Sequence, residues 1–323
     1  MKEFNAKKNI LSLLRKHVGD FLSGEEISDV LGFSRASVWK YIKKLREDGY
    51  GIEGASHNGY KLELVPDKVH GYDIAGIAGT DILGKGNVFY YDTISSTNDK
   101  AYELAEKGEK EGTIVIAEEQ TGGKGRMGRS WVSPRDGGMY LSLILRPGTS
   151  PDETASITLI AAISMVKTIR EIAGIDPKIK WPNDILHKGR KLCGILTEIK
   201  AQPDAVEFLV MGIGLNINTS RENLPPEATS IKEECGRRID RKKVVSAFLE
   251  EFENNYRAFQ KTGFSPMREE FRNMSLVFGK PVRIAQQNKE IYGTALDIDD
   301  TGALLVKTEK DNIKRIFSGD VTI

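Results

Sequence analysis

A glycine-rich loop near the middle of the chain carries three cationic side chains within six residues. Gln120 to Trp131 reads QTGGKGRMGRSW, and the cations are Lys124, Arg126 and Arg129. Glycine lets a backbone approach a ligand closely, and an anion that binds there would offset the entropic cost of ordering the loop. With its flanking tryptophan, this mixture indicates an anion-binding loop. An exposed basic loop without a ligand is the alternative.

The same loop nearly matches two phosphate-binding motifs, and the residues that follow it exclude both. It fits GxGxxG through Gly123, Gly125 and Gly128, and it nearly fits GxxxxGK[ST], with Arg129 in place of the lysine. Each motif needs a helix directly after the glycines, because backbone N–H groups and the helix dipole then meet the phosphates. Here the sequence WVSPRDGGMYLSLILR indicates a loop that leads into a strand. We therefore predict neither a dinucleotide-binding fold nor a P-loop.

Three further segments could act together with this loop. Lys180-Trp-Pro-Asn-Asp184 holds a lysine, an amide and a carboxylate in one turn, and Lys191 begins a strand-like run. A lysine ammonium near an attacked phosphorus stabilises the charge that develops in the transition state, while Asp184 could hold Mg²⁺ against polyphosphate oxygens. Ser95-Ser-Thr-Asn98 would begin a helix whose free N–H groups and hydroxyls suit a carboxylate or a polar head group. Taken singly, ordinary helix caps and surface lysines are the alternative.

Residues 1–65 follow the order helix, helix, turn, helix and hairpin, which is that of a winged helix-turn-helix. Ser34 would cap the third helix, whose apolar stripe packs inward while its opposite face is a cationic strip suited to a major groove. The Arg and Lys side chains would mostly neutralise phosphates, and the helix start could read base edges. We predict DNA contacts from Ser34, Arg35, Ser37, Lys40, Lys43 and Lys44. The hairpin tip, with Ser56, His57 and Asn58, could reach the adjacent backbone or minor groove. A protein-docking domain with a solvated basic face is the alternative.

The remainder of the chain predicts an α+β arrangement in two parts. Residues 66–273 mix strands with helices, and several strands follow one another without a helix between them. This order favours a mixed or antiparallel sheet with flanking helices over a strictly alternating parallel one. Residues 274–323 contain only short strand-like runs, which indicate a small β-barrel.

Bulk composition narrows the class of protein. The chain has 323 residues, enough for two or three domains, and its 39% hydrophobic content allows a sizeable core. The net charge is +1, so any nucleic-acid contact must come from a local patch. No apolar run approaches the roughly 20 residues that span a bilayer, and the N-terminus lacks a signal-peptide pattern. Cys193 and Cys235 lack disulfide or zinc spacing, so we expect reduced thiols in a cytoplasmic protein without membrane contact.

Five motifs in a fixed order carry a resemblance to a known family. The segments SSTN, GKGRMG, KWPND, GRKLCGIL and GIGLNIN resemble those of the bifunctional biotin–protein ligase/biotin-operon repressor (BirA-type) family, over essentially the whole chain. The resemblance implies a central domain similar to class II aminoacyl-tRNA synthetases, followed by an SH3-like barrel. It implies activation of biotin by MgATP to biotinyl-5′-AMP, and transfer of biotin to a lysine of the biotin carboxyl carrier protein of biotin-dependent carboxylases. It further implies a homodimer that represses biotin synthesis genes at operator DNA when biotinyl-AMP is bound.

The resemblance also implies roles for individual residues. Lys191 and Arg126 would be catalytic, and Asp184 would bind the metal ion. The biotin site would comprise Ser96, Thr97, Asn98, Gln120, Lys124, Gly125, Arg126, Lys191 and Gly194. The nucleotide site would comprise Arg126, Arg129, Trp131, Lys180, Asn183 and Asn216.

Two positions depart from the family's usual GRGRRG loop. Lys124 and Met127 each stand where the family has an arginine. A lysine keeps the charge but loses the bidentate fork, so we expect the loop to close less tightly and to release the adenylate faster. Two alternatives to the ligase and repressor stay open at this point: a ligand-sensing transcription factor that has lost catalysis, and a ligase for another acid such as lipoate.

Overall fold

The computed structural model describes residues 2–55, 58–77, 79–85, 87–202, 205–286, 289–309 and 311–323. The chain divides into two compact units, Met1–Ile77 and Ala78–Ile323. Among the described residues, no helix combines the length and the apolar character needed to cross a bilayer.

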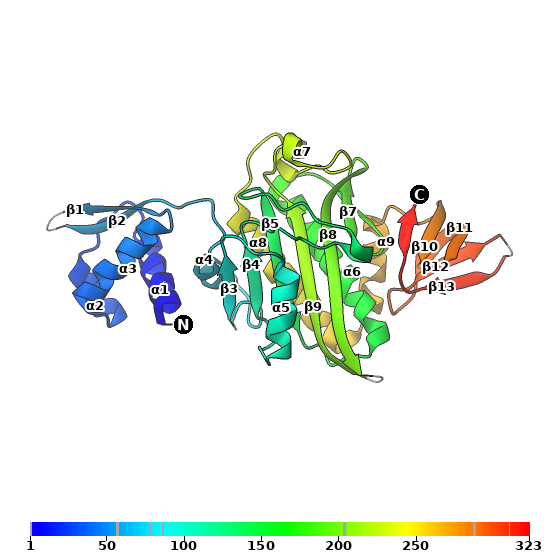
Figure 1. The fold of residues 1–323 in the computed structure, drawn as a ribbon, viewed down its shortest axis with the longest axis horizontal. Helices are drawn as coiled ribbons and strands as arrows, with labels where there is room; N and C mark the ends of the chain where they lie inside the picture. The colour runs from blue at the N-terminus through cyan, green and yellow to red at the C-terminus, as the bar shows by residue number, and fades with distance from the viewer. Residues whose placement is uncertain are drawn as a thin grey trace. The chain divides into compact units, whose positions relative to one another are not determined.

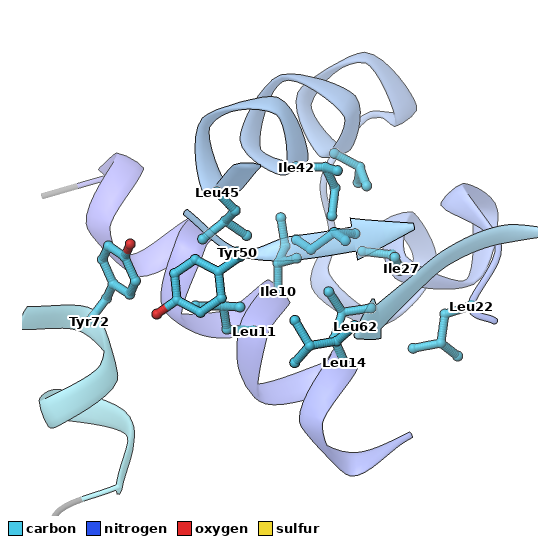
Figure 2. Close-up of a cluster of buried hydrophobic side chains, with 12 residues drawn as sticks. Ile10, Leu11, Leu14, Leu22, Ile27, Ile42, Leu45, Tyr50, Leu62 and Tyr72 are labelled. Atoms are coloured by element: carbon cyan, nitrogen blue, oxygen red, sulfur yellow. The ribbon is translucent and has the colours of Figure 1, made fainter. Parts of the chain in front are cut away.

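The first unit has the predicted winged helix-turn-helix order, with one additional helix after it. Its elements are α1 (Lys2–Lys16), α2 (Gly24–Leu31), α3 (Arg35–Glu47), β1 (Gly51–Ala55), β2 (Gly59–Leu64) and α4 (Gly71–Ile77). Figure 2 shows its core, in which side chains from all three helices of the motif meet the hairpin and Tyr72 of α4. Ser56 and His57, expected at the hairpin tip, lie outside the described residues.

Local sequence signals set the helix ends in this unit. Ser23 caps α2 with a capping box that it forms with Glu26, and Gly32 ends the helix in the left-handed conformation. Ser34 caps α3 by accepting a hydrogen bond from the Ser37 N–H, as the sequence predicts. The cap fixes the start of the helix that carries the basic face.

Helix α4 belongs to the first unit because buried polar contacts hold it there. Asp73 is fully buried and pairs with Arg15 of α1 and with the Tyr50 hydroxyl. The Tyr72 hydroxyl donates to Asp48 at 2.8 Å. A buried carboxylate is stable only with such partners, so these contacts keep α4 on the helix-turn-helix. The limit predicted at residue 65 falls before this helix.

The second unit is built on a mixed seven-stranded sheet, which confirms the expected sheet type. Its order is β3-β4-β5-β9-β8-β7-β6; β3 and β4 are parallel and every other neighbouring pair is antiparallel. The strands are β3 (Val88–Tyr91), β4 (Ile114–Ala117), β5 (Gly138–Leu145), β6 (Lys178–Lys180), β7 (Asp184–His187), β8 (Arg190–Gln202) and β9 (Ala205–Asn216).

Helices cover both faces of this sheet. Figure 1 shows α5 (Thr97–Glu106) on one face, and α6 (Thr154–Ala173) and α8 (Arg241–Thr262) on the other. Helix α6 is buried on nearly all sides because it lies between the sheet and α8. Two short helices that the sequence did not signal complete this part, α7 (Ile231–Cys235) and α9 (Arg268–Met274).

The chain ends in an antiparallel five-stranded sheet, in the region where the sequence predicts short strands and no helix. Its order is β13-β12-β11-β10-β14, and the strands are β10 (Pro281–Gln286), β11 (Lys289–Ile298), β12 (Leu304–Thr308), β13 (Ile313–Ile316) and β14 (Asp320–Thr322). The buried Trp181 donates its indole N–H to the Gly302 carbonyl at 3.1 Å. This contact joins the KWPND turn to the C-terminal sheet.

Candidate functional site

Two adjoining cavities in the second unit bring most of the predicted ligand-site residues together. The narrow cavity has a volume of about 50 Å³ and the wide cavity one of about 710 Å³. The wide cavity lies within the range of roughly 300–1,000 Å³ that is usual for ligand pockets. Both cavities are lined by Gly125, Arg126, Trp131, Asn183 and Lys191.

Buried polar side chains at the start of α5 form one wall of the narrow cavity. Ser96 is the N-cap of this helix, and Thr97 and Asn98 follow it, all three nearly inaccessible to solvent. The side-chain oxygen of Gln120, Oε1, accepts from the Thr97 N–H at 2.8 Å and from the Thr97 hydroxyl at 3.0 Å. The amide of Gln120 donates to the Ser133 hydroxyl at 2.9 Å. Because buried polar groups need partners, this network fixes their orientation toward the cavity.

Two residues that hold Asn98 were not predicted from the sequence. The Ser142 hydroxyl donates to Asn98 Oδ1 at 2.7 Å, and Asn98 Nδ2 donates to Glu198 Oε2 at 2.7 Å. A signal exists for Ser142, which is a polar residue inside the apolar strand MYLSLIL, but not for Glu198, which lies beside Thr197 and near Lys200. A buried polar position in a strand needs a partner across the sheet.

Three glycines leave room for side chains that line the narrow cavity. A Cβ atom at Gly214 would lie 2.4 Å from Trp131, and one at Gly194 would lie 3.1 Å from it. A Cβ atom at Gly212 would lie 2.0 Å from Asn98 Oδ1. Alternate residues of a strand share a face, so the GIG of β9 places two of these glycines side by side under the cavity.

Lys191 and Arg126 reach the junction of the two cavities from different elements. Lys191, on β8, lies 2.8 Å from Asp184 Oδ1, with its ammonium 5.5 Å from the Trp131 ring centre. Arg126, in the loop, donates to Asn183 Oδ1 at 2.9 Å and to the Gly319 carbonyl at 3.2 Å. Burial lowers the pKa of Arg126, an effect that the nearby Asp184 carboxylate opposes. The two side chains thus bring an ammonium and a guanidinium group to the same junction.

The other two cations of the loop are tied to separate elements. Arg129 lies 2.7 Å from Asp320 of the C-terminal sheet, and Lys124 lies 2.5 Å from Asp99 of α5. The loop contains a single 3-10 turn, Arg126–Gly128, and then leads into β5. The expectation that no helix follows its glycines is confirmed.

The remaining predicted residues lie on the wide cavity or behind it. Lys180 and Asp184 line the wide cavity. Asn216 lines neither cavity: it is buried, and its amide donates to the Thr229 carbonyl at 3.1 Å. Among the described residues, Asn216 Oδ1 and Trp131 Nε1 are buried without a hydrogen-bond partner. Trp131 lines both cavities, so its indole N–H is placed to serve a ligand there.

The carboxylates at the wide cavity suit a magnesium ion that binds together with phosphates. Asp184, Glu227 and Asp320 line this cavity. The described residues contain no group of three or more His, Cys, Asp or Glu side chains that could hold a metal ion by themselves. Mg²⁺ is usually bound by one or two carboxylates together with substrate phosphates and water. The donor set therefore fits a nucleotide-bound Mg²⁺ rather than a protein-enclosed one.

In the first unit, the predicted basic face of α3 is largely exposed. Val38, Ile42 and Leu45 are buried as expected, while Lys40 and Lys43 are exposed. Trp39 lies between the cations on this face, with 58% of its surface exposed. Lys44 is engaged by Glu3 of α1, so it is less available than the other lysines of this helix.

Comparison with known proteins agrees with this geometry along the whole chain. Residues 90–216 match the Biotin/lipoate A/B protein ligase family, residues 7–61 match an HTH domain, and residues 277–323 match the Biotin protein ligase C terminal domain. The bifunctional ligase/repressor BirA of Bacillus subtilis (strain 168) is 41% identical over 98% of each chain. The chain belongs to the BirA family of bifunctional ligase/repressors.

Further BirA-family and biotin ligase relatives support the assignment. The BirA protein of Escherichia coli (strain K12) is 31% identical, over 99% of this chain and 97% of its own. The solved structure of biotin protein ligase from Aquifex aeolicus in complex with biotin and ATP is 30% identical. It superposes with a TM-score of 0.63, over 73% of this chain and 97% of that one. Membership of the BirA family confirms the resemblance drawn from the five sequence motifs.

Proposed function

We propose that this chain is an ATP-dependent, AMP-forming biotin–protein ligase that also represses transcription. It activates biotin to biotinyl-5′-AMP with release of pyrophosphate, and it transfers the biotinyl group to a lysine of biotin carboxyl carrier protein. One observation carries the enzymatic part: Lys191 and Arg126 line both the narrow and the wide cavity. An acyl-phosphate formed between an acid in one cavity and a nucleotide in the other would lie between these two cations.

The first step joins biotin to AMP. A carboxylate oxygen of biotin attacks the α-phosphorus of ATP, and the bond from that phosphorus to the leaving pyrophosphate breaks. Lys191 and Arg126 stabilise the negative charge that develops on the phosphoryl oxygens, because fixed cations in a partly buried site need little reorganisation. Mg²⁺ would neutralise phosphate charge when bound, with Asp184 as its protein ligand. The loop around Gly125 shields the product from water.

The second step transfers biotin to the acceptor. The lysine amine attacks the carbonyl carbon of the mixed anhydride, and the bond from that carbon to the phosphate oxygen breaks. AMP leaves with the bonding electrons, and the nitrogen loses its proton as the amide forms. Lys191 and Arg126 are placed to stabilise the AMP phosphate as it departs.

The two cavities suggest which residues serve each substrate. We assign the biotin head group to the narrow cavity, with the residues Ser96, Thr97, Asn98, Gln120, Lys124, Gly125 and Gly194. We assign the nucleotide to the wide cavity, with the residues Arg126, Arg129, Trp131, Lys180, Asn183 and Asp184. For Asn216, which lines neither cavity, the adenylate role rests on the family resemblance, and its amide supports the Thr229 carbonyl behind the wide cavity.

Biotin-dependent exchange of pyrophosphate into ATP tests the enzymatic proposal. A ligase gives exchange that requires biotin, whereas a ligand sensor without catalysis gives none. Lipoate provides the second arm of the assay, because a lipoate-type ligase would support exchange with lipoate in place of biotin. Competition between biotin and lipoate then shows which of the two acids the enzyme prefers.

The repressor role rests on the first unit. The exposed cations of α3 suit a major groove, and Ser34, Arg35 and Ser37 stand at the helix start, where base edges would be read. A homodimer with biotinyl-AMP bound would place two such helices on a palindromic operator. Gel mobility on a palindromic site, with and without biotin and ATP, tests this part.

Both cysteines are free thiols, which supports a cytoplasmic location.

A further inference from the structure

A buried carboxylate lies behind the strand that carries Lys191. Glu234 of α7 has a side chain that is 2% exposed. Its Oε1 accepts from Arg190 Nη2 at 2.5 Å and from the Thr229 hydroxyl at 2.7 Å. Its Oε2 lies 3.6 Å from His187 Nε2 and 3.6 Å from Lys188 Nζ. Burial raises the pKa of Glu234. The Thr229 hydrogen bond and the nearby positive charges, Arg190 first among them, together outweigh that effect, so the pKa lies below its ordinary value.

Both hydrogen-bond partners of Glu234 adjoin the backbone of Lys191. Arg190 directly precedes Lys191, and successive side chains of a strand point to opposite faces. The Thr229 N–H donates to the Lys191 carbonyl at 2.9 Å, and the Lys191 N–H donates to the Glu227 carbonyl at 2.8 Å. Both peptide groups of Lys191 are therefore hydrogen-bonded to the segment 227–229, and Glu234 joins that same segment to Arg190.

The same threonine also supports the wall of the wide cavity. Thr229 is fully buried, and its carbonyl accepts from the Asn216 amide at 3.1 Å. Glu227 and Ala228, directly before it, line the wide cavity. The backbone and side chain of Thr229 therefore join β8, β9 and Glu234, and any movement of Thr229 would displace this wall.

We propose that Glu234 is a positioning residue for the adenylation reaction. By joining Arg190 to Thr229, it holds the Lys191 strand and the nucleotide wall at a fixed separation. Glu234 lines neither cavity, so it acts through these neighbours and does not touch substrate. The inference rests on the proposed function, since it assigns Lys191 and the wide cavity to adenylation.

Two single variants and their combination test this role. Glu234→Gln keeps the shape and an acceptor for Thr229 but removes the charge that holds Arg190. Arg190→Gln removes the same contact from a side chain that is 40% exposed, so it decides the matter if Glu234→Gln does not fold. Glu233→Gln, at an exposed position of the same helix, is the matched control. Each variant is assayed in the full-length protein for biotin-dependent pyrophosphate exchange, well below its melting temperature, with kcat and the KM for ATP measured separately.

We expect Glu234→Gln and Arg190→Gln each to lower kcat about tenfold and to raise the KM for ATP. This is less than the roughly 100-fold that a 1 Å misplacement of reacting groups can cost. The double variant should lose no more activity than either single variant, because both remove one contact. Its melting temperature should recover relative to Arg190→Gln, which leaves the buried Glu234 carboxylate without its arginine, but its activity should not.

Several outcomes would overturn the inference. A kcat for Arg190→Gln equal to that of Glu233→Gln would show that the contact does not position Lys191. Recovery of both stability and activity in the double variant would reduce Glu234 to a purely structural partner of Arg190. If the unmodified protein showed no biotin-dependent exchange at all, the proposed function would fail instead. The two failures are therefore distinguishable.

Discussion

At the scale of single residues, the decisive feature is how Lys191 is held. Its ammonium lies against Asp184 and near the Trp131 ring, at the junction of both cavities. A flexible lysine stem loses considerable side-chain entropy when it is ordered. Because Asp184 already fixes the ammonium in the protein, less of that entropy remains to be lost in the transition state.

Replacing Lys191 by alanine should lower adenylation roughly 100-fold or more, the scale of losing one preorganised electrostatic contact. The measurement is biotin-dependent pyrophosphate exchange at saturating biotin and ATP. Lys107→Ala, which removes an exposed lysine at the C-cap of α5, is the control and should leave the rate unchanged. An unaltered rate in Lys191→Ala would remove this residue from its proposed role.

Single residues also show what sequence reasoning can and cannot predict here. Lys191 and Arg126 were predictable because cations in these motifs indicate acyl-phosphate chemistry, and Gln120 was predictable only through the family resemblance. The Ser142 and Glu198 contacts to Asn98 were not, since they depend on which strands are neighbours. The partners of Lys124 and Arg129, Asp99 and Asp320, lie in distant segments, and no local pattern indicates such long-range pairing.

At the scale of elements, the long periodic segments and the short apolar strands were predictable, but several other short elements were not. Helices α5, α6 and α8 and the long strands follow their sequence patterns closely. Strands β6, β7 and β14 and helices α4, α7 and α9 are at most seven residues long. A segment of this length carries too few residues for a periodicity to stand out. Their positions depend on tertiary contacts such as the pairing of Asp73 with Arg15.

The basic face of α3 should contribute affinity rather than sequence selectivity. The double variant Lys40→Ala/Lys43→Ala should weaken operator and non-specific DNA similarly. Each lost phosphate contact should reduce the slope of log Kobs against log salt by about 0.9. Titrations at several salt concentrations measure this, with Lys107→Ala as the control. An unchanged slope would place the DNA-binding surface elsewhere.

The contacts between α4 and the helix-turn-helix should make the first unit sensitive to acid. Burial lowers the pKa of His70, which stacks on Tyr72 and lies 3.1 Å from the Asp48 carbonyl. Protonation is therefore easier in the unfolded chain, whose histidine pKa is about 6.5. The free energy of unfolding should then fall as the pH drops through that value and below it, and not above it.

Hydrogen exchange of α1 amides in the full chain, corrected for intrinsic rates, measures this pH dependence. His70→Gln should flatten the loss of protection between pH 7.5 and pH 5.5. His17→Gln, at an exposed position, should leave the loss as it is. Equal profiles for both variants would contradict the assignment to His70.

At the scale of the whole molecule, the two activities belong to separate compact units. Every residue that lines either cavity lies in Ala78–Ile323, and the basic face of α3 lies in Met1–Ile77. The three matched family models follow the same order along the chain. The ligase cavities and the helix-turn-helix therefore lie in different units of one chain.

Removal of residues 1–77 should abolish operator binding and leave biotin-dependent pyrophosphate exchange measurable. A cut after residue 77 removes α4 together with its partners Asp48, Tyr50 and Arg15. A cut after residue 65 would leave α4 on the remaining protein without these partners. Gel mobility and exchange assays on the same truncated protein provide both readouts. Persistent operator binding, or complete loss of exchange in a folded protein, would contradict this division of labour.

The most direct test of the account is a crystal structure of the full chain with a non-hydrolysable analogue of biotinyl-AMP. We expect the biotin moiety in the narrow cavity and the adenosine in the wide one. The phosphate should then lie within hydrogen-bonding distance, about 3 Å, of both Lys191 Nζ and the Arg126 guanidinium. A ligand bound elsewhere, or a phosphate that faces solvent away from these cations, would contradict the enzymatic mechanism.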